Sequence, residues 1–267
     1  MVSSASLACM AVSTLVVFTL PFAAVLVARR RGLAMQIRPV LVGAVVFILF
    51  ALVLERLLHT AVFSVFPQIQ TIPVAYMLYG ALAAGVFEEG GRACGFTLLR
   101  RMKGADNGLP CAIGYGAGHA GAEAILLVGF GLISNIMVAM TLNAPGGMDT
   151  LMASVPEASR ELATAQLQGL IDAAPASFLL AGFERIVAFA LQLSLSVVVW
   201  MAVSGRLSKA WIGGAVLLHA LSDCGAALYQ AGAASMLVAE LCTVAVTVAV
   251  VGMTIHLYRQ SASTARA

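Results

Sequence analysis

The chain has 267 residues, of which 61% are hydrophobic and only 10% are charged, and its mean hydropathy is +0.99. A soluble domain has about 45–50% apolar and about 25% charged residues, so this composition excludes a soluble globular protein and predicts a polytopic membrane protein. The formal net charge of +3 is small, and the positions of the charges carry more information than their sum. We expect the lipid bilayer as the environment, the cell membrane as the location, and no nucleic-acid partner.

Seven apolar stretches are long enough to cross a membrane as helices, which takes about 20 residues each. They lie at residues 7–28, 39–64, 73–100, 109–141, 178–203, 209–230 and 233–258. The sequence therefore predicts an all-α fold, a polytopic bundle of about seven transmembrane helices that forms one integral membrane domain over residues 1–267.

The first span is followed by Arg29, Arg30 and Arg31, whereas a cleavable signal peptide has its positive charges before the apolar core. We therefore expect an uncleaved anchor with the N-terminus outside. Between the fourth and fifth spans, residues 143–177 form a longer polar connection, which we expect to be extracytoplasmic. Within it, residues 150–171 suit an amphipathic helix that lies on the membrane surface.

The distribution of basic residues agrees with seven spans. Cytoplasmic loops of membrane proteins are enriched in Lys and Arg. With seven spans, the loops on the predicted outer side contain a single basic residue, Arg160. All other Lys and Arg residues of the loops lie on the opposite side. The sequence thus predicts an N-terminus outside and a C-terminus inside. The basic residues of the predicted cytoplasmic side are Arg29, Arg30, Arg31, Arg38, Arg100, Arg101, Lys103, Arg206, Lys209, Arg259 and Arg266.

The third span carries the motif EEGGR, with Glu88, Glu89 and Arg92, in its middle. A charged side chain at bilayer depth costs about 2.5–3.5 kcal/mol on insertion scales, so such groups are retained where they face partners or a wet cavity. Glu88 and Arg92 are four residues apart and share a helix face, where they can pair. The motif suits a general base oriented by a second carboxylate and a cation; an ion pair that joins helices is the structural alternative. Small residues in this span are expected to let another helix approach closely: Gly85, Gly90, Gly91 and Gly95.

Two further spans carry a histidine and a carboxylate one helical turn apart. The fourth span has His119 and Glu123 in the sequence GHAGAE, and the sixth has His219 and Asp223 in the sequence LLHALSD. Residues four apart lie on one face of a helix, so each pair can act together. A buried, hydrogen-bonded structural histidine is the alternative for each pair taken alone.

Depth in the membrane links the three motifs. Glu89, His119 and His219 each lie about ten residues from the predicted cytoplasmic end of their span, or about 15 Å at a rise of about 1.5 Å per residue. This is close to the middle of a hydrocarbon core of about 30 Å. We predict that these side chains converge on one water-filled pocket within the bilayer.

Other polar residues are expected to have structural roles or to line a cavity. Glu55 and Arg56 in the second span, and Glu184 and Arg185 in the fifth, lie nearer the outer face, and we expect Glu55 to pair with Arg185 and Glu184 with Arg56. The cysteines have no CxxC spacing and lie on apolar segments, so we expect buried, inert thiols: Cys9, Cys94, Cys111, Cys224 and Cys242.

The three motifs and their order resemble the YhfC family of intramembrane proteases: EEGGR, then His119 with Glu123, then His219 with Asp223. That family is similar to PrsW proteins and to the CAAX prenyl endopeptidase and bacteriocin-processing (CPBP) group. The shared pattern is a paired-Glu motif with a following basic residue, then a His motif, then HxxxD or HxxxN, on separate helices. The resemblance covers roughly residues 40–230. The CAAX group usually has a longer gap between the paired Glu and Arg than the Gly-Gly of this chain, so its prenylated substrate is not carried over.

The resemblance implies an endopeptidase that hydrolyses peptide bonds of membrane proteins or lipidated peptides within the membrane. In a glutamate-type scheme, Glu88 acts as the base on a water, with His119 assisting, while Glu89 and Arg92 orient the Glu88 carboxylate. The candidate catalytic residues are Glu88, Glu89, Arg92, His119, Glu123, His219 and Asp223.

The same scheme uses His219 and Asp223 to stabilise the oxyanion that forms from the scissile carbonyl. In a metalloprotease scheme, His119, His219 and Glu88 bind zinc and leave one position open for water. The metal-free scheme is preferred because the sequence has no HExxH motif and the histidines must meet across helices, but the residues serve both schemes.

Two functions of other classes also fit part of the pattern. Carboxylates and histidines near the midplane suit an ion-coupled membrane transporter, although the inverted repeats common in transporters are not seen in this sequence. A catalytically silent membrane scaffold, which binds other membrane proteins through its small-residue helix faces, is the remaining alternative.

Overall fold

The computed structural model of the chain describes residues 1–104 and 107–264. Every regular element in the described residues is helical, which confirms the all-α prediction. Arg266, one of the basic residues used to predict the topology, lies outside the described residues.

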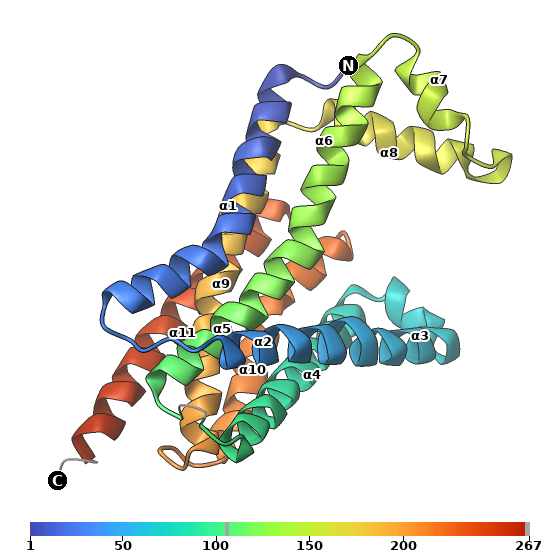
Figure 1. Cartoon of the computed structure of the whole chain (residues 1–267). Coiled ribbons are helices and arrows are strands. Elements are labelled where there is room, and N and C mark those ends of the chain that lie inside the picture. Colours follow the sequence, from blue (N-terminus) through green and yellow to red (C-terminus); the bar gives the residue numbers. More distant parts are fainter. Residues whose placement is uncertain (105–106, 265–267) are drawn as a thin grey trace. The chain divides into compact units, whose positions relative to one another are not determined.

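The helices follow the predicted spans to within a few residues. In chain order they are α1 (Ser4–Arg30), α2 (Ile37–Phe47), α3 (Arg56–Val65), α4 (Pro73–Arg101), α5 (Leu109–Glu123), α6 (Phe130–Asn143), α7 (Gly147–Met152), α8 (Arg160–Asp172), α9 (Pro175–Val203), α10 (Ala210–Gln230) and α11 (Met236–Thr264) (Figure 1). Short 3-10 turns at Pro67–Thr71 and Glu157–Ser159 precede α4 and α8.

Two of the spans contain a π-helical segment, which the sequence pattern did not predict. Helix α2 continues through Ile48–Glu55 into α3, and α5 continues through Ala124–Gly129 into α6. A π-helical turn inserts an extra residue into an α-helix and often occurs at functional sites. The first segment ends at Glu55, and the second begins directly after Glu123, a candidate site residue.

Six helices among the described residues are long and apolar enough to cross a membrane, and they correspond to six of the predicted spans. The remaining one, α4, has 29 residues but carries a charged motif in its middle. Large apolar side chains such as Leu15 (65% exposed), Leu217 (63%) and Val248 (67%) cover the outer helix surfaces, which is the arrangement that lipid requires and water disfavours. The chain is therefore a multi-pass integral membrane protein. Seven spans, with the N-terminus outside and the C-terminus inside, stay a prediction.

The chain divides into two compact units, one formed by Met1–Leu20 with Ala124–Ile186 and one formed by Pro21–Glu123 with Val187–Ala267. Helices α1 and α9 each contribute residues to both units, and the helix that runs from α5 into α6 passes from one unit to the other at Glu123. A single membrane domain over the whole chain stays a prediction.

The first unit contains the polar connection 143–177. Residues 153–156, between α7 and α8, are not helical, in part because Pro156 disfavours a helical conformation of the preceding residue. The helix expected over residues 150–171 is therefore shorter and begins at Arg160. None of the residues of α8, all of which are described, is buried. Its position on the membrane surface and the extracytoplasmic side of the connection stay predictions.

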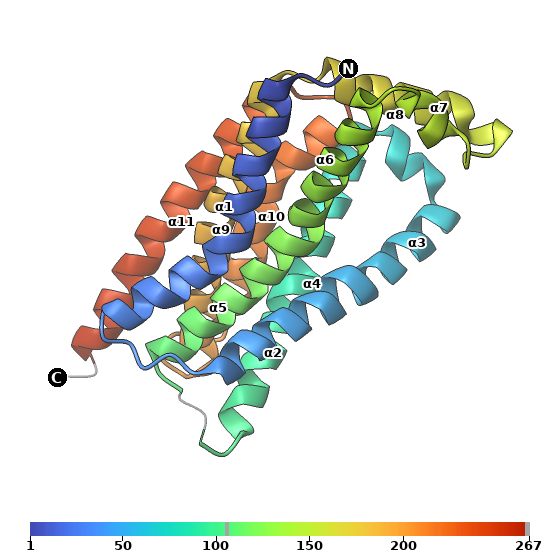
Figure 2. The same cartoon turned by 45° about the horizontal axis from the view of Figure 1, so that its top comes forward.

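The second unit is built around the second half of α9, where Leu195, Val198 and Met201 are fully buried. Helix α4 packs along α10, and α2 packs along α5 (Figures 1 and 2). These two helix pairs, with α9, bring together segments far apart in the sequence. All of the candidate site residues belong to this unit.

Glycines allow the close packing of α4, with one exception. A Cβ atom on Gly85 would lie 2.6 Å from the carbonyl oxygen of Val216 on α10, so only glycine permits this approach. Gly91 and Gly95 face aromatic side chains at the same distance. Gly90 faces open space, and the expectation that it admits a neighbouring helix was wrong.

Candidate active site

Helix α4 places the EEGGR motif deep in the second unit. The helix starts at Pro73, whose fixed φ suits a first helical position, and it ends in Arg100 and Arg101, whose charge is favourable near a helix C-terminus. This leaves the motif near the middle of the helix, about 22 Å from its start at about 1.5 Å per residue. The motif is thereby held by rigid backbone rather than by a loop.

Glu88, Glu89 and Arg92 are buried together on α4. Glu89 and Arg92 have no exposed surface, and Glu88 is 8% exposed. The Arg92 Nε atom lies 3.3 Å from Glu89 Oε2, whereas the nearest guanidinium nitrogen lies 4.0 Å from Glu88 Oε2. Arg92 thus pairs more closely with Glu89 than with Glu88, the partner expected from the i,i+4 spacing. The Glu88 carboxylate is left nearer to groups of other helices.

His119 on α5 contacts the Glu88 carboxylate. Its Nε2 atom lies 2.9 Å from Glu88 Oε2 and 3.2 Å from Arg92 Nη2. The ring is fully buried between Phe47 and Tyr115. One ring nitrogen cannot donate to a carboxylate and accept from a guanidinium at once, so the protonation of Nε2 decides which contact forms. The other nitrogen, Nδ1, is buried and has no hydrogen-bond partner among the described residues.

His219 on α10 lies among three carboxylates. Its Nδ1 atom is 2.7 Å from Glu89 Oε1, and its Nε2 atom is 3.5 Å from Asp223 Oδ2 and 3.9 Å from Glu88 Oε2. Asp223 in turn accepts a hydrogen bond of 3.1 Å from Ser222 Oγ. His219 and Asp223 therefore occupy one helix face, as their spacing predicts, and this face is directed at the EEGGR motif.

Gln192 on α9 connects the groups of the site, and the sequence interpretation missed it. Its Nε2 atom donates to Glu88 Oε2 at 3.0 Å and to Glu123 Oε2 at 2.7 Å, while its Oε1 atom accepts from Arg92. The main-chain carbonyl of Gln192 also accepts from Arg92, at 2.8 Å. Ser196, one turn later, is a further partner of the guanidinium. The signal available in the sequence was one long amide within an otherwise apolar or small-residue stretch.

Hydrogen bonds and ion pairs join all seven candidate residues into one cluster from three helices. Glu88, Glu89 and Arg92 come from α4, and His219 with Asp223 comes from α10. His119 and Glu123 come from α5, and Glu123 is joined to Glu88 through the Gln192 amide rather than directly. The convergence of these side chains from separate helices is thus present in the described residues, and a water-filled pocket around them stays a prediction.

Negative charge dominates the part of the cluster around His219. The carboxylates of Glu88, Glu89 and Asp223 surround this ring, and Arg92 is the guanidinium that contacts the first two. Buried charges are costly unless they are paired. The excess of negative charge is balanced by protonation of a group within the cluster or by a bound cation.

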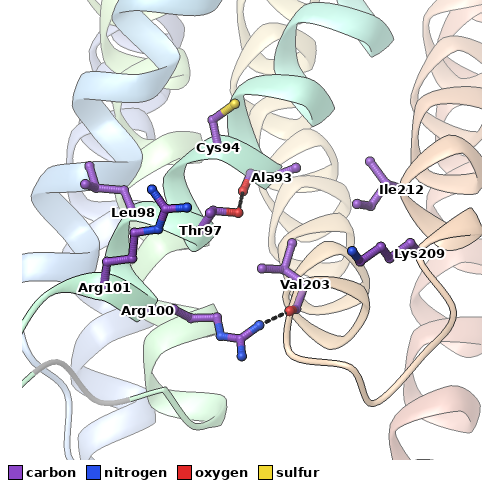
Figure 3. Close-up of a pocket in the computed structure, with 9 residues that line it drawn as sticks. All are labelled: Ala93, Cys94, Thr97, Leu98, Arg100, Arg101, Val203, Lys209 and Ile212. Carbon is purple, nitrogen blue, oxygen red and sulfur yellow. Dashed lines mark hydrogen bonds between the residues drawn. The ribbon is translucent and has the colours of Figure 1, made fainter.

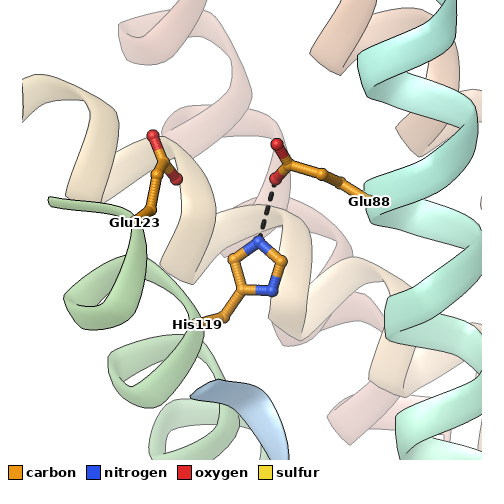
Figure 4. A group of neighbouring side chains, drawn as sticks. All are labelled: Glu88, His119 and Glu123. Carbon is orange, nitrogen blue, oxygen red and sulfur yellow. Dashed lines mark hydrogen bonds and ion pairs between the residues drawn. The ribbon is translucent and has the colours of Figure 1, made fainter. Parts of the chain in front are cut away.

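Three donor groups of the cluster are close enough to bind one metal ion. One ligand atom from each of Glu88, His119 and Glu123 lies within 4.8 Å of the other two. Figure 4 shows these side chains, with the His119 ring directed at the Glu88 carboxylate. Ligands that share a tetrahedral zinc ion at about 2.0–2.2 Å are about 3.4 Å apart. The zinc set expected from the sequence had His219 in place of Glu123, and the Nε2 atom of His219 lies 3.9 Å from the same Glu88 oxygen.

A second polar group, separate from the cluster, lies on α4 and where the first π-helical segment meets α3. His59 contacts Glu55 Oε1 at 3.2 Å through Nε2 and Tyr79 Oη at 2.8 Å through Nδ1. In the first unit, Glu184 pairs with its neighbour Arg185. The pairing of Glu55 with Arg185, and of Glu184 with Arg56, would join residues of different units and stays a prediction.

Comparison with known proteins identifies relatives of the chain. Residues 16–243 match the family described as YhfC intramembrane metalloprotease. The uncharacterized membrane protein YhfC of Bacillus subtilis (strain 168) is 33% identical over 235 residues, which cover 87% of this chain and 88% of that protein. No solved structure gives a significant match.

Proposed function

The chain belongs to the YhfC intramembrane metalloprotease family, and from that premise we propose that it is an endopeptidase that hydrolyses peptide bonds of membrane-associated substrates. The observation that carries this proposal is the contact of Glu88 with His119 and Gln192 beside His219, in the middle of a helix with apolar surroundings. Intramembrane ionisable groups mark functional sites by default, and a carboxylate with an imidazole at hydrogen-bond distance is suited to proton transfer.

Glu88 is proposed as the general base. Its hydrogen bonds and ion pairs with the described residues all involve Oε2. The Oε1 atom is therefore assigned to the attacking water, from which it takes a proton as the oxygen of the water attacks the scissile carbonyl. Gln192 and His119 hold the carboxylate in place, and the proton then passes to the leaving nitrogen.

His219 and Asp223 are proposed to act on the scissile carbonyl. A donor aimed at the developing oxyanion lowers the barrier of acyl transfer. Because Nδ1 of His219 donates to the Glu89 carboxylate, the Nε2 atom donates to the carbonyl oxygen only if the ring carries both protons, and the proposal requires that form. Glu89 and Arg92 are positioning residues, since they orient His219 and Glu88.

The donor set fits a divalent metal ion. Two carboxylates and an imidazole, from Glu88, Glu123 and His119, are ligand types that zinc accepts, and a cation would offset the surplus of carboxylates around His219. The unpartnered Nδ1 atom of His119 fits less well, because a metal-ligating histidine usually donates its other N–H. A bound zinc ion would supply a Lewis acid for the water and the carbonyl. We propose the metal-bound form in place of the metal-free form, on the donor set and the family description. In that form Glu88 would hold the ion through Oε2, in place of its contact with His119, and would keep Oε1 as the base.

A comparison of newly formed peptide termini tests this function. Membranes from cells that produce the wild-type chain, the Glu88→Gln variant or the Glu161→Gln variant are labelled at free N-termini and analysed by mass spectrometry. Glu161 is exposed on α8 and serves as the matched control. We expect membrane-protein termini that occur with the wild type and Glu161→Gln but not with Glu88→Gln at equal protein level. Identical sets of termini for all three proteins would contradict the proposal.

A further inference from the structure

A cavity of about 770 Å³ lies between α4 and the segment that joins α9 to α10, at the end of α4 that carries Arg100 and Arg101. Figure 3 shows the side chains that line it: Ala93, Cys94, Thr97, Leu98, Arg100, Arg101, Val203, Lys209 and Ile212. None of these residues belongs to the catalytic cluster. The catalytic cluster therefore does not explain the presence of this cavity.

Three cations line this cavity, two from α4 and one from the start of α10. Arg100 and Arg101 extend from the last turn of α4, and Lys209 extends from the residue before α10 (Figure 3). One guanidinium nitrogen of Arg100 donates to the carbonyl of Val203, which fixes this side chain across the space between the helices. The described residues that line the cavity include no carboxylate. An anionic group is thus the complementary ligand for these cations.

Apart from Thr97, the rest of the lining is apolar, and the cavity opens to the outer surface of the helices. Cys94 and Leu98 on α4 are exposed, the latter by 52%, and Val203 and Ile212 form the other wall. On a membrane-spanning helix, an exposed apolar side chain contacts acyl chains rather than water. The expectation of a buried thiol was accordingly wrong for Cys94, and also for Cys242.

We propose that this cavity binds one anionic phospholipid, with its phosphate against Arg101, Lys209 and Arg100 and an acyl chain along Leu98 and Ile212. The charged part of the lining coincides with the ends of α4 and α9 and the start of α10, which is where a bilayer places its headgroups. Basic pockets between transmembrane helices are suited to anionic headgroups, to which each Lys or Arg near the surface is worth about 1 kcal/mol. The combination of cations with an outward-facing apolar wall favours a lipid over a water-soluble anion or an acidic peptide.

Binding of dioleoylphosphatidylglycerol to the purified full chain in detergent, counted by native mass spectrometry during a titration, tests this proposal without any peptidase assay. Dioleoylphosphatidylcholine, inorganic phosphate and an acidic peptide are titrated in parallel. We expect the phosphatidylglycerol to bind at least tenfold more tightly than phosphatidylcholine, and neither inorganic phosphate nor the peptide to displace it.

Two kinds of variant separate the charge from the cavity. Arg101→Gln combined with Lys209→Gln should weaken phosphatidylglycerol binding about 30-fold, and Thr97→Trp, which fills the space without changing any charge, should weaken it about tenfold. Both are compared with Arg30→Gln combined with Arg31→Gln, exposed cations outside the cavity, which should change binding by less than about twofold. The proposal is overturned if the control weakens binding as much as the cavity variants, if Thr97→Trp binds normally, or if inorganic phosphate or the peptide displaces the lipid.

Discussion

Replacement of Gln192 by Met removes the amide that connects the candidate site while it keeps the length and approximate volume of the side chain. The amide is oriented without ambiguity: Glu88 and Glu123 offer acceptor oxygens to its NH₂ group, and Arg92 offers only donors to its carbonyl oxygen. Methionine provides neither donors nor a strong acceptor. The substitution therefore removes three hydrogen bonds to charged groups at one buried position, which is 3% exposed.

The expected loss of stability follows from those three bonds. Hydrogen bonds to charged groups are worth about 1.5–3 kcal/mol each in soluble proteins, whereas side-chain hydrogen bonds measured within a membrane average about 0.6 kcal/mol. We take about 1 kcal/mol for each, and so expect Gln192→Met to lower the free energy of unfolding by about 3 kcal/mol. We also expect peptidase activity to fall at least tenfold, because the Glu88 carboxylate loses one of the groups that hold it.

Unfolding in mixed micelles of increasing dodecyl sulfate content, followed by circular dichroism, measures the stability difference. The matched control is Gln168→Met on α8, where an exposed amide donates at 3.0 Å to the Asp172 carboxylate in the next turn. This control should change the free energy of unfolding by less than about 0.5 kcal/mol. If Gln192→Met loses less than about 1 kcal/mol and retains full activity, the assigned role of the amide is wrong.

Three further outcomes follow from the geometry. Arg92→Met leaves the Glu89 carboxylate buried without its cation, so unfolding measurements should show a loss of about 3–5 kcal/mol; a loss below about 1 kcal/mol would contradict the burial of this pair. Gly85→Ala forces a methyl group toward the carbonyl of Val216 and should cost about 1–3 kcal/mol, whereas Gly90→Ala, in open space, should gain up to about 1 kcal/mol; equal effects of the two would refute the packing of α4 on α10. Removal of divalent metal by a chelator should abolish peptidase activity and added zinc should restore it, and full activity of a protein shown by elemental analysis to lack metal would establish the metal-free scheme instead.

The helix positions could be predicted closely because apolar length and charge mark them directly. The third span was expected at residues 73–100 and is Pro73–Arg101, since a proline begins it and consecutive arginines end it. The convergence of the three polar motifs was predicted from their common depth. Depth follows from counting residues along each helix, and it requires no knowledge of side-chain packing.

The partners within the site depend on packing that residue counting does not provide. Arg92 can reach either Glu88 or Glu89 on its own helix, at i−4 or i−3, and His119 and His219 from other helices decide which carboxylate remains near it. Gln192 was missed for the same reason. Which face of α9 meets α4 is determined by the core of the second unit, and a single amide has no spacing pattern that reveals it.

The π-helical segments and the open space at Gly90 also depend on tertiary structure. Neither Ile48–Glu55 nor Ala124–Gly129 differs in composition from the α-helical apolar residues beside it, so the sequence pattern continues unbroken through both. Gly90 and Gly91 are adjacent, but they point in directions about 100° apart on a helix of 3.6 residues per turn. Only one of them faces a neighbouring helix.

The assignment of Glu88 as the base is tested most directly by the rate at which purified protein in lipid nanodiscs cleaves a transmembrane peptide that contains a cleavage site found with the wild type. General-base catalysis contributes about 10²–10⁴-fold, and Glu88→Gln preserves the size of the side chain. We expect kcat/KM of Glu88→Gln to be lower than that of the wild type by at least about 100-fold, with the melting temperature retained. Cleavage by Glu88→Gln at the wild-type rate would contradict the account.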